Sequence, residues 1–156
     1  MSNIENVYPE SFYRGITEAN KINLEFKRVL GDVFRFSGEH LNDDGYDEIS
    51  INWNDDDDSL NNIKCQKKGE RYQFENGIVK VPTRKIKEMK NRYLEDFSYE
   101  RKPIEGNIYH GNLLLNFNKV EKQWRKFIAD ELATNIDTIY TYNIENDSWN
   151  EYKTEI

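Results

Sequence analysis

The side chain best suited to acid–base chemistry in this sequence is His110, one of its two histidines. It stands within residues 107–112, where polar side chains and Gly111 interrupt an apolar, strand-like segment. A glycine inside a strand indicates a bulge or a close approach of another part of the chain. A histidine at such a place can exchange a proton near neutral pH, or its ring can bond to nearby backbone. The sequence leaves both roles open for His110.

Two arginines stand among aromatic residues in strand-like segments. Arg14 follows Tyr13 in an early apolar run, and Arg35 lies between two phenylalanines. An arginine drawn partly into a fold must pair with a carboxylate or hold an anion, because an unpaired buried charge is costly. Both explanations fit Arg14 and Arg35. If the two converge with His110, they would form a small anion pocket in which His110 and Arg14 are catalytic.

The net charge of −7 is unevenly distributed along the chain. Residues 1–60 carry a net charge of −9, residues 61–102 carry +6 and residues 103–156 carry −4. Such asymmetry is typical of an electrostatic interaction surface, or of oppositely charged segments that face each other within the fold. The basic part includes a predicted helix face that could bind nucleic-acid phosphates or could simply be solvated. Its cationic side chains are Lys85, Lys87, Lys90 and Arg92.

Carboxylates gather at residues 43–48 and again at residues 55–58. The second run lacks the alternating ligand spacing and the trailing glutamate of a calcium-binding loop, and no cysteine–histidine cluster accompanies it. The sequence also contains no glycine-rich phosphate-binding motif and no nucleophile-elbow motif. We therefore expect solvated acidic loops, no metal site and no cofactor.

The order of apolar side chains predicts an α+β domain. Spacings of three and four residues predict helices that begin near Thr83 and Asn118, whereas residues 18–30 fit either a helix or a strand, with helix preferred. Asn76-Gly77 between two short strands predicts a tight hairpin. Strands are predicted at residues 11–16, 32–37, 48–53, 72–74, 78–81, 108–115 and 137–142.

Strands and helices do not alternate regularly along the chain. This irregular order predicts a mixed, mainly antiparallel sheet with two or three amphipathic helices packed on it. The length predicts a single domain over residues 1–156, with loosely held termini at residues 1–10 and 143–156. No apolar stretch is long enough for a membrane-spanning helix, and no secretory signal is recognisable. We therefore expect a cytoplasmic protein that does not associate with membranes.

Four short blocks carry a resemblance to known sequences. They are Tyr13-Arg14, residues 34–37 with the pattern Phe-x-x-Ser, residues 50–52 with the pattern Ser-Ile-Asn, and His110-Gly111. In these blocks the chain resembles small bacterial proteins that have no established activity. The resemblance implies no mechanism, but it suggests that Arg14, Ser50 and His110 are neighbours in the fold.

The small size, the split charge and the lack of a cofactor motif favour a protein-binding or accessory domain of bacterial or phage-related origin. Its expected partner is another protein, and its oligomeric state is open. One alternative is a small enzyme that acts on a nucleotide or another anionic substrate through Arg14, Arg35 and His110. Another is nucleic-acid binding through the basic segment 64–92, with an affinity that falls steeply as salt rises.

Overall fold

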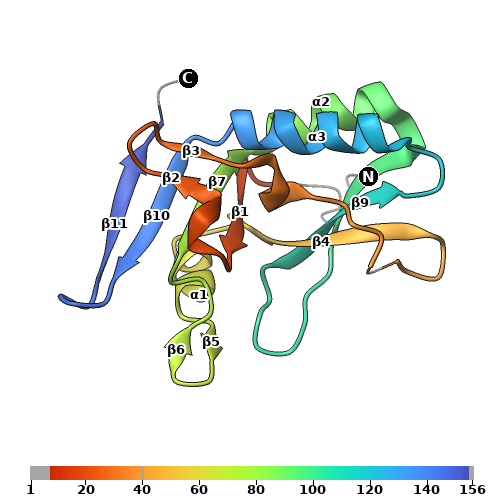
Figure 1. Ribbon diagram of the computed structural model, residues 1–156. Coiled ribbons are helices and arrows are strands. Elements are labelled where there is room, and N and C mark those ends of the chain that lie inside the picture. Colours follow the sequence, from red (N-terminus) through yellow and green to blue (C-terminus); the bar gives the residue numbers. More distant parts are fainter. Residues whose placement is uncertain (1–7, 40, 155–156) are drawn as a thin grey trace.

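The structure is a computed structural model that describes residues 8–39 and 41–154. Its centre is a seven-stranded sheet in the order β11-β10-β7-β1-β4-β9-β8, and the neighbouring strands are antiparallel. Helices pack on this sheet (Figure 1), which confirms the predicted α+β class. The strands are β1 (Ser11–Ile16), β4 (Tyr46–Trp53), β7 (Gly77–Pro82), β8 (Phe97–Arg101), β9 (His110–Asn116), β10 (Thr138–Asn143) and β11 (Ser148–Lys153).

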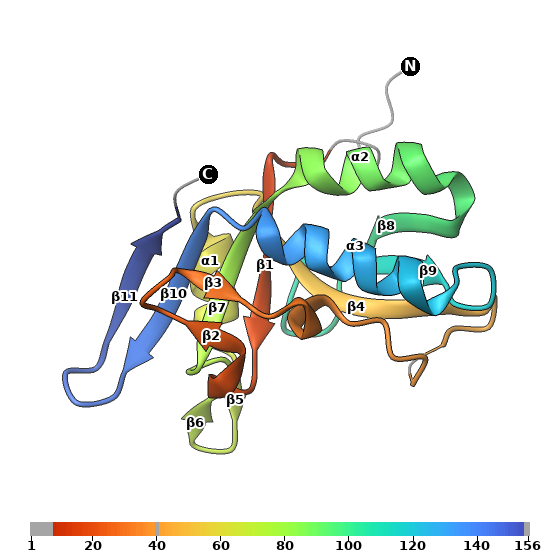
Figure 2. The ribbon, with the colours of Figure 1, turned by 45° about the horizontal axis from the view of Figure 1, so that its top comes forward.

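Helices α2 (Thr83–Tyr93) and α3 (Lys122–Thr134) lie side by side on one face of the sheet (Figures 1 and 2). Helix α1 (Asp58–Lys64) lies on the opposite face, next to a small hairpin. None of the helices in the described part of the chain is long and apolar enough to cross a membrane. The hairpin consists of β5 (Lys67–Lys68) and β6 (Arg71–Tyr72).

Between β1 and β4 the chain passes through four short elements, of which β3 and η3 lie beside α3 (Figure 2). A further short turn, η4, connects α2 to β8. These connecting elements are η2 (Ala19–Lys21), β2 (Ile22–Asn23), β3 (Arg28–Val29), η3 (Gly31–Phe34) and η4 (Leu94–Asp96).

The main core fills the space between the sheet and helices α2 and α3. Alternate residues of β4 enter it, because successive side chains of a strand point to opposite faces. Burying one such large apolar side chain contributes about 1.5–3 kcal/mol. The largest fully buried members of this core are Phe12, Phe34, Trp53, Ile86, Met89, Phe97, Leu113, Leu115, Ile128, Leu132 and Ile139.

A second, smaller core lies on the other face of the sheet, beneath α1. Ile63 of α1 packs there on Tyr13, Ile78 and Tyr140, which come from three adjacent strands. The ring centroids of Tyr13 and Tyr140 lie 6.2 Å apart in an edge-on arrangement. The two cores together bury both faces of the central strands β1 and β7.

The buried tyrosines of the second core should make the protein less stable at alkaline pH. Burial, reinforced by the charges of Asp137 and Glu151, raises the pKa of Tyr13 to about 12. An unfolded tyrosine titrates near pH ~10. The unfolded state therefore loses its phenol proton first, and stability should fall as the pH rises from about 10 through about 12. Urea unfolding across this window should show a smaller loss for Tyr13→Phe, and an identical loss would contradict this origin.

The structure corrects two predictions in the first quarter of the chain. Residues 18–30 form no α-helix: Ile22 pairs with Val29 in the β2–β3 hairpin, and Lys27 has a φ of 52°, which a helix does not tolerate. Residues 32–37 form no strand either. Their first half belongs to the short helix η3, which places Val33 and Phe34 together in the main core. The alternation of residue types wrongly predicted a strand with one buried face, because the apolar side chains Val33, Phe34 and Phe36 are all buried.

Other differences lie further along the chain. The predicted Asn76-Gly77 hairpin is wrong, because β7 pairs with β1 and β10 and the preceding residues form a turn. Pro82 rather than Thr83 holds the N-cap position of α2. Part of the acidic run at residues 55–58 begins helix α1. The chain beyond residue 143, expected to be loose, forms edge strand β11 on β10, and residues 1–7 of the expected loose lead-in lie outside the described residues.

Candidate functional site

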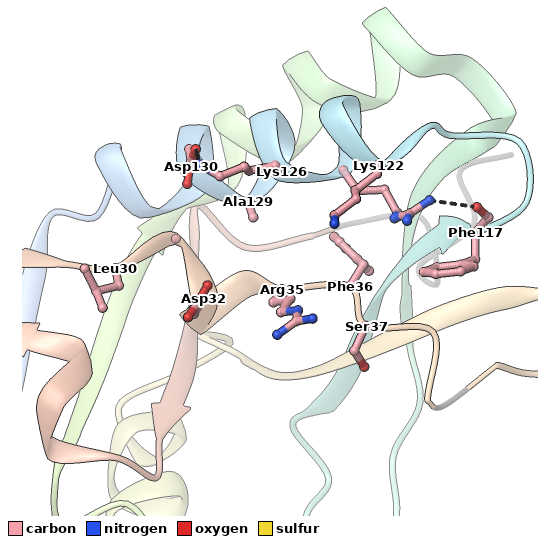
Figure 3. Close-up of a pocket in the computed structure, with 12 residues that line it drawn as sticks. Leu30, Asp32, Arg35, Phe36, Ser37, Phe117, Lys122, Lys126, Ala129 and Asp130 are labelled. Atoms are coloured by element: carbon pink, nitrogen blue, oxygen red, sulfur yellow. Dashed lines mark hydrogen bonds and ion pairs between the residues drawn. The ribbon is translucent and has the colours of Figure 1, made fainter.

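A groove of about 460 Å³ lies between the segment around η3 and helix α3 (Figure 3). This volume falls within the range typical of small-molecule sites. Residues 30–37 form one wall, and residues of α3 spaced three and four apart, from Lys122 to Asp130, form the other. Such spacing places the helix residues on one face of α3. We name this cavity, which Phe117 completes, the η3–α3 groove.

Small residues bring the two walls of the groove together. A side chain at Gly31 would overlap the carboxylate of Asp130, so the η3 segment and helix α3 are in contact at this point. Ala129 lies next to Asp130 on the helix wall. The lack of a side chain at Gly31 therefore lets the η3 segment approach α3 closely at Asp130.

Cationic side chains border the groove from both walls. Arg35 and Lys122 are exposed, and within the described parts of the chain the side chain of neither makes a hydrogen bond or an ion pair. Lys126 lies between them along α3, with its Nζ 3.5 Å from Oδ2 of Asp130. The charge of Arg35 acts on the nearby carboxylate of Asp32 without forming an ion pair, so within the described residues the side-chain donor groups of both Arg35 and Lys122 stay unengaged.

A fourth cation, Arg125, is held in place by the backbone. Its Nη1 donates to the carbonyl oxygens of Val120 and Phe117 at 2.7 and 3.3 Å. Its guanidinium also lies 4.0 Å from the centre of the Phe117 ring. Arg125 therefore fixes this end of the groove and adds a positive charge to it.

The two carboxylates of the groove are already engaged. Lys21 donates to Oδ2 of Asp32 at 3.0 Å, and Asp130 faces Lys126. The hydrogen bond from Lys21 lowers the pKa of Asp32. Both carboxylates are therefore paired with lysine, and the lowered pKa of Asp32 makes that group a poor proton acceptor.

The remaining lining of the groove is largely apolar. Figure 3 shows Phe36 and Phe117 near Lys122 at one end and Leu30 near Asp130 at the other. Among the described residues, the lining contains no histidine or cysteine. Positive charges beside an apolar wall can hold an anion that has an apolar body, but this set of residues offers no free acid–base pair.

No protein-family model, curated protein or solved structure matches this chain. The functional conclusion therefore depends on the geometry of the groove and of the residues singled out from the sequence.

Arg14 lies inside the fold, between β1 and η3, and is partly buried. Strands β1 and β4 pair only at Phe12–Trp53 and Tyr13–Asn52 and then separate. At that point Arg14 donates from Nη1 to the carbonyl of Ser50 at 2.8 Å and from Nε to the carbonyl of Val33 at 2.9 Å. Burial lowers the pKa of Arg14 to about 10, so the group stays protonated at pH 7. Its described partners are backbone carbonyls.

His110 lies at the start of β9, on the sheet face opposite the main core. Its Nδ1 lies 2.9 Å from the carbonyl oxygen of Lys102. A carbonyl oxygen only accepts, so Nδ1 carries the proton and Nε2 of the neutral ring keeps its lone pair. The register places His110 opposite Asn52, diagonal to Ser50. The ring is thus oriented by backbone and faces a polar part of the sheet.

The three residues expected to converge take different places. Arg14 contacts the backbone of Ser50. In the β4–β9 ladder Ser50 lies two residues before Asn52, the partner of His110. Arg35 instead lines the η3–α3 groove, and neither Arg14 nor His110 is part of that lining. No described hydrogen bond joins any two of the side chains of Arg14, Arg35 and His110.

The basic residues of α2 are partly engaged within the fold. Nζ of Lys85 lies 2.8 Å from Glu131 on α3 and 3.3 Å from Glu88. Burial lowers the pKa of Lys85, but the two carboxylates together raise it above its ordinary value. Lys85 therefore links α2 to α3, in agreement with charged segments that face each other.

The other three residues of the predicted basic face, Lys87, Lys90 and Arg92, are exposed. Lys90 donates to Oγ of Ser98 at 3.0 Å, and the guanidinium of Arg92 lies 5.7 Å from the centre of the Phe127 ring. Lys87 lies near the N-terminal end of α2, on the first half of its exposed face. The four side chains thus form no continuous row of unengaged cations.

The acidic run at residues 55–58 also has internal contacts. Asp55 receives two hydrogen bonds from the guanidinium of Arg101, at 2.7 and 2.8 Å. Asp56 accepts from the hydroxyl of Tyr109 at 2.9 Å. These contacts attach the end of β4 to the strands beside it. In the described part of the chain, no group of three or more histidine, cysteine or carboxylate side chains is arranged to hold a metal.

Sequence reasoning singled out Arg35 but missed the cations opposite it on α3. Lys122, Arg125 and Lys126 recur at spacings of three and four in the predicted second helix, which was a visible signal for one basic face. Nothing in the sequence indicated that residue 35 would face this helix.

Proposed function

We propose that this protein is a binding domain for an organic anion, which it holds in the η3–α3 groove. The observation that carries this proposal is the pair of cations, Arg35 and Lys122, that border an apolar groove and whose side chains make no hydrogen bond or ion pair with the described residues. The proposal keeps the binding role that the sequence favoured and gives it a location.

The chemistry of each wall supports an anion with an apolar body. A guanidinium such as that of Arg35 can donate two parallel hydrogen bonds to a carboxylate, phosphate or sulfonate. Lys122 on the opposite wall is a mobile point charge that can approach the same group. Leu30 and Phe117 offer apolar surface to the rest of the ligand. Binding would thus replace water around two charges with a fixed counter-charge.

The same lining favours binding over catalysis. The carboxylates of Asp32 and Asp130 are occupied by Lys21 and Lys126, and no described residue of the groove is a histidine or a cysteine. The enzyme alternative requires His110 and Arg14 to act on the anion held by Arg35, and no described contact or cavity joins these residues.

A fluorescent probe tests the proposal directly. Anilinonaphthalene sulfonate combines aromatic rings with one negative charge and brightens in apolar surroundings. The native protein should bind it, and the double variant Arg35→Glu with Lys122→Glu should have a dissociation constant about tenfold higher or more. This loss corresponds to about 1.4 kcal/mol, which is reasonable for two partly exposed ion contacts worth up to about 1 kcal/mol each.

The matched control is Arg84→Glu with Lys87→Glu, which makes the same change of charge on the exposed face of α2. It should bind the probe like the native protein, and all variants should keep the native far-ultraviolet circular dichroism and unfolding temperature. Equal weakening by both pairs would mean that only the overall charge matters. That result, or unchanged binding by the first pair, would contradict the proposed site.

A further inference from the structure

The η3–α3 groove has a continuation. A second cavity of about 650 Å³ is lined by residues 25–29 of the β2–β3 hairpin and by Ala133 and Thr134 at the end of α3. Leu30 of the first cavity directly follows Val29 of the second. The two cavities therefore lie next to each other, with the contact between Gly31 and Asp130 near their junction.

Both cavities follow one stripe of α3. Their helix residues include Lys122, Lys126, Asp130 and Thr134, each four positions after the previous one. The opposite wall runs the other way, because residues 25–29 face the end of α3 and residues 35–37 face its start (Figure 2). At ~1.5 Å per helical residue, this stripe is about 18 Å long. An extended peptide would cover it with about six residues, whereas a small organic anion would occupy only one part.

Large apolar side chains stand exposed on the segment that forms this wall. Phe26 is 62 % exposed, Leu30 is 52 % exposed and Leu24 is 39 % exposed. Three such side chains within seven residues form an apolar rim that water does not favour. A partner that covers them would contribute apolar contacts along the stripe as well as charge.

The charge of the stripe is opposite to that of the whole protein. Glu25, Asp32 and Asp130 are its carboxylates, and six cationic side chains outnumber them in a chain of net charge −7. The cations are Lys27, Arg28, Arg35, Lys122, Arg125 and Lys126. A partner that is both acidic and apolar complements this surface.

We infer that the occupant of the two cavities is an extended acidic segment of another protein, in which carboxylates alternate with apolar side chains. The inference rests on the proposed function of the η3–α3 groove and identifies its ligand. In an extended segment alternate side chains point in opposite directions, so a segment lying between the two walls can turn its apolar side chains toward Phe26 and Leu30 and its carboxylates toward the cations of α3. The three carboxylates along the stripe disfavour the continuous phosphates of a nucleic acid.

Titration calorimetry with defined peptides tests the inference. The probe is a peptide of about eight residues in which glutamate and leucine alternate, blocked at both ends, and its short form has about three residues. The long peptide should bind the native protein at least about tenfold more tightly than the short one. Arg35→Glu with Lys122→Glu, and separately Lys27→Glu with Arg28→Glu, should each weaken the long peptide about tenfold. The α2 control pair, Arg84→Glu with Lys87→Glu, should not.

Each other outcome overturns the inference in a distinct way. If the two peptide lengths bind equally, or only the first pair matters, the ligand is a small anion confined to the η3–α3 groove and the proposed function stands alone. If a single-stranded oligonucleotide competes more strongly than the peptide and depends on the same four residues, the partner is a nucleic acid. If neither the peptide nor anilinonaphthalene sulfonate binds, the inference and the proposed function both fail.

Discussion

Gly111→Ala is expected to lower the free energy of unfolding by about 3 kcal/mol or more. A Cβ at Gly111 would overlap the indole nitrogen of Trp53 and the carbonyl oxygen of Glu100. These two atoms form a hydrogen bond of 3.1 Å directly above the glycine. Trp53 is fully buried and the carbonyl belongs to the β8–β9 ladder, so neither can move away cheaply. The added methyl group would both overpack the core and break that bond.

Gly31→Ala is the matched control for this prediction. It makes the same chemical change, but there the new methyl group meets the exposed carboxylate of Asp130, the far end of a flexible side chain. Chemical denaturation followed by tryptophan fluorescence should give a loss below about 1 kcal/mol for this control. If Gly111→Ala proves as mild as Gly31→Ala, the close packing of Trp53 on β9 is not a determinant of stability.

Arg14→Ala should cost about 2–4 kcal/mol of unfolding free energy. The reason is the direction of the Ser50 carbonyl. The backbone N–H of Trp53 donates to the Tyr109 carbonyl, so the alternation of an antiparallel ladder turns the Ser50 carbonyl away from β9, toward the place where β1 has separated. The Arg14 guanidinium supplies the donor that the missing strand pairing does not, and it holds the Val33 carbonyl of η3 as well.

Arg14→Met separates this structural role from an anion-binding role. Methionine fills similar space without donors, so it should also destabilise the protein, by about 1–3 kcal/mol, because two carbonyls lose their partner. If Arg14 instead waits for a ligand, its burial without a counter-ion is a cost, and methionine should stabilise the ligand-free protein. Arg84→Ala on the exposed face of α2 is the control and should change stability by less than about 0.5 kcal/mol.

Local patterns in the sequence were sufficient to predict the positions of strands that have one face in the main core. In β4, Ile49, Ile51 and Trp53 alternate with polar residues, and the predicted strand at residues 48–53 lies within the observed β4. The same holds for β1, predicted with the bounds that the structure has. Helices α2 and α3 were recognisable from their apolar spacing, although α3 begins later than Asn118. In these elements local periodicity and tertiary packing agree.

Local patterns failed where the backbone conformation depends on distant contacts. Residues 18–37 have apolar side chains that fit a helix and a strand, and the observed hairpin and short helix are selected by packing against α3. Asn76-Gly77 resembles a hairpin turn, but Asn76 donates from its side chain to the carbonyl of Thr17 at 2.8 Å and β7 pairs elsewhere. The acidic run hid helix α1, whose apolar residue Ile63 becomes informative only against the sheet.

The sequence by itself determined the α+β class, the main strands and the two long helices, and it singled out Arg35 as a cation among aromatic residues. The tertiary structure decided which cations share a site. Strands β4, β7, β8 and β9 lie between Arg35 and Lys122 in the sequence. The two residues line the same groove only because η3 packs on α3. It also directed Arg14 to backbone carbonyls and His110 to the opposite face, because strand register and strand separation are properties of the assembled sheet, and no local pattern encodes them.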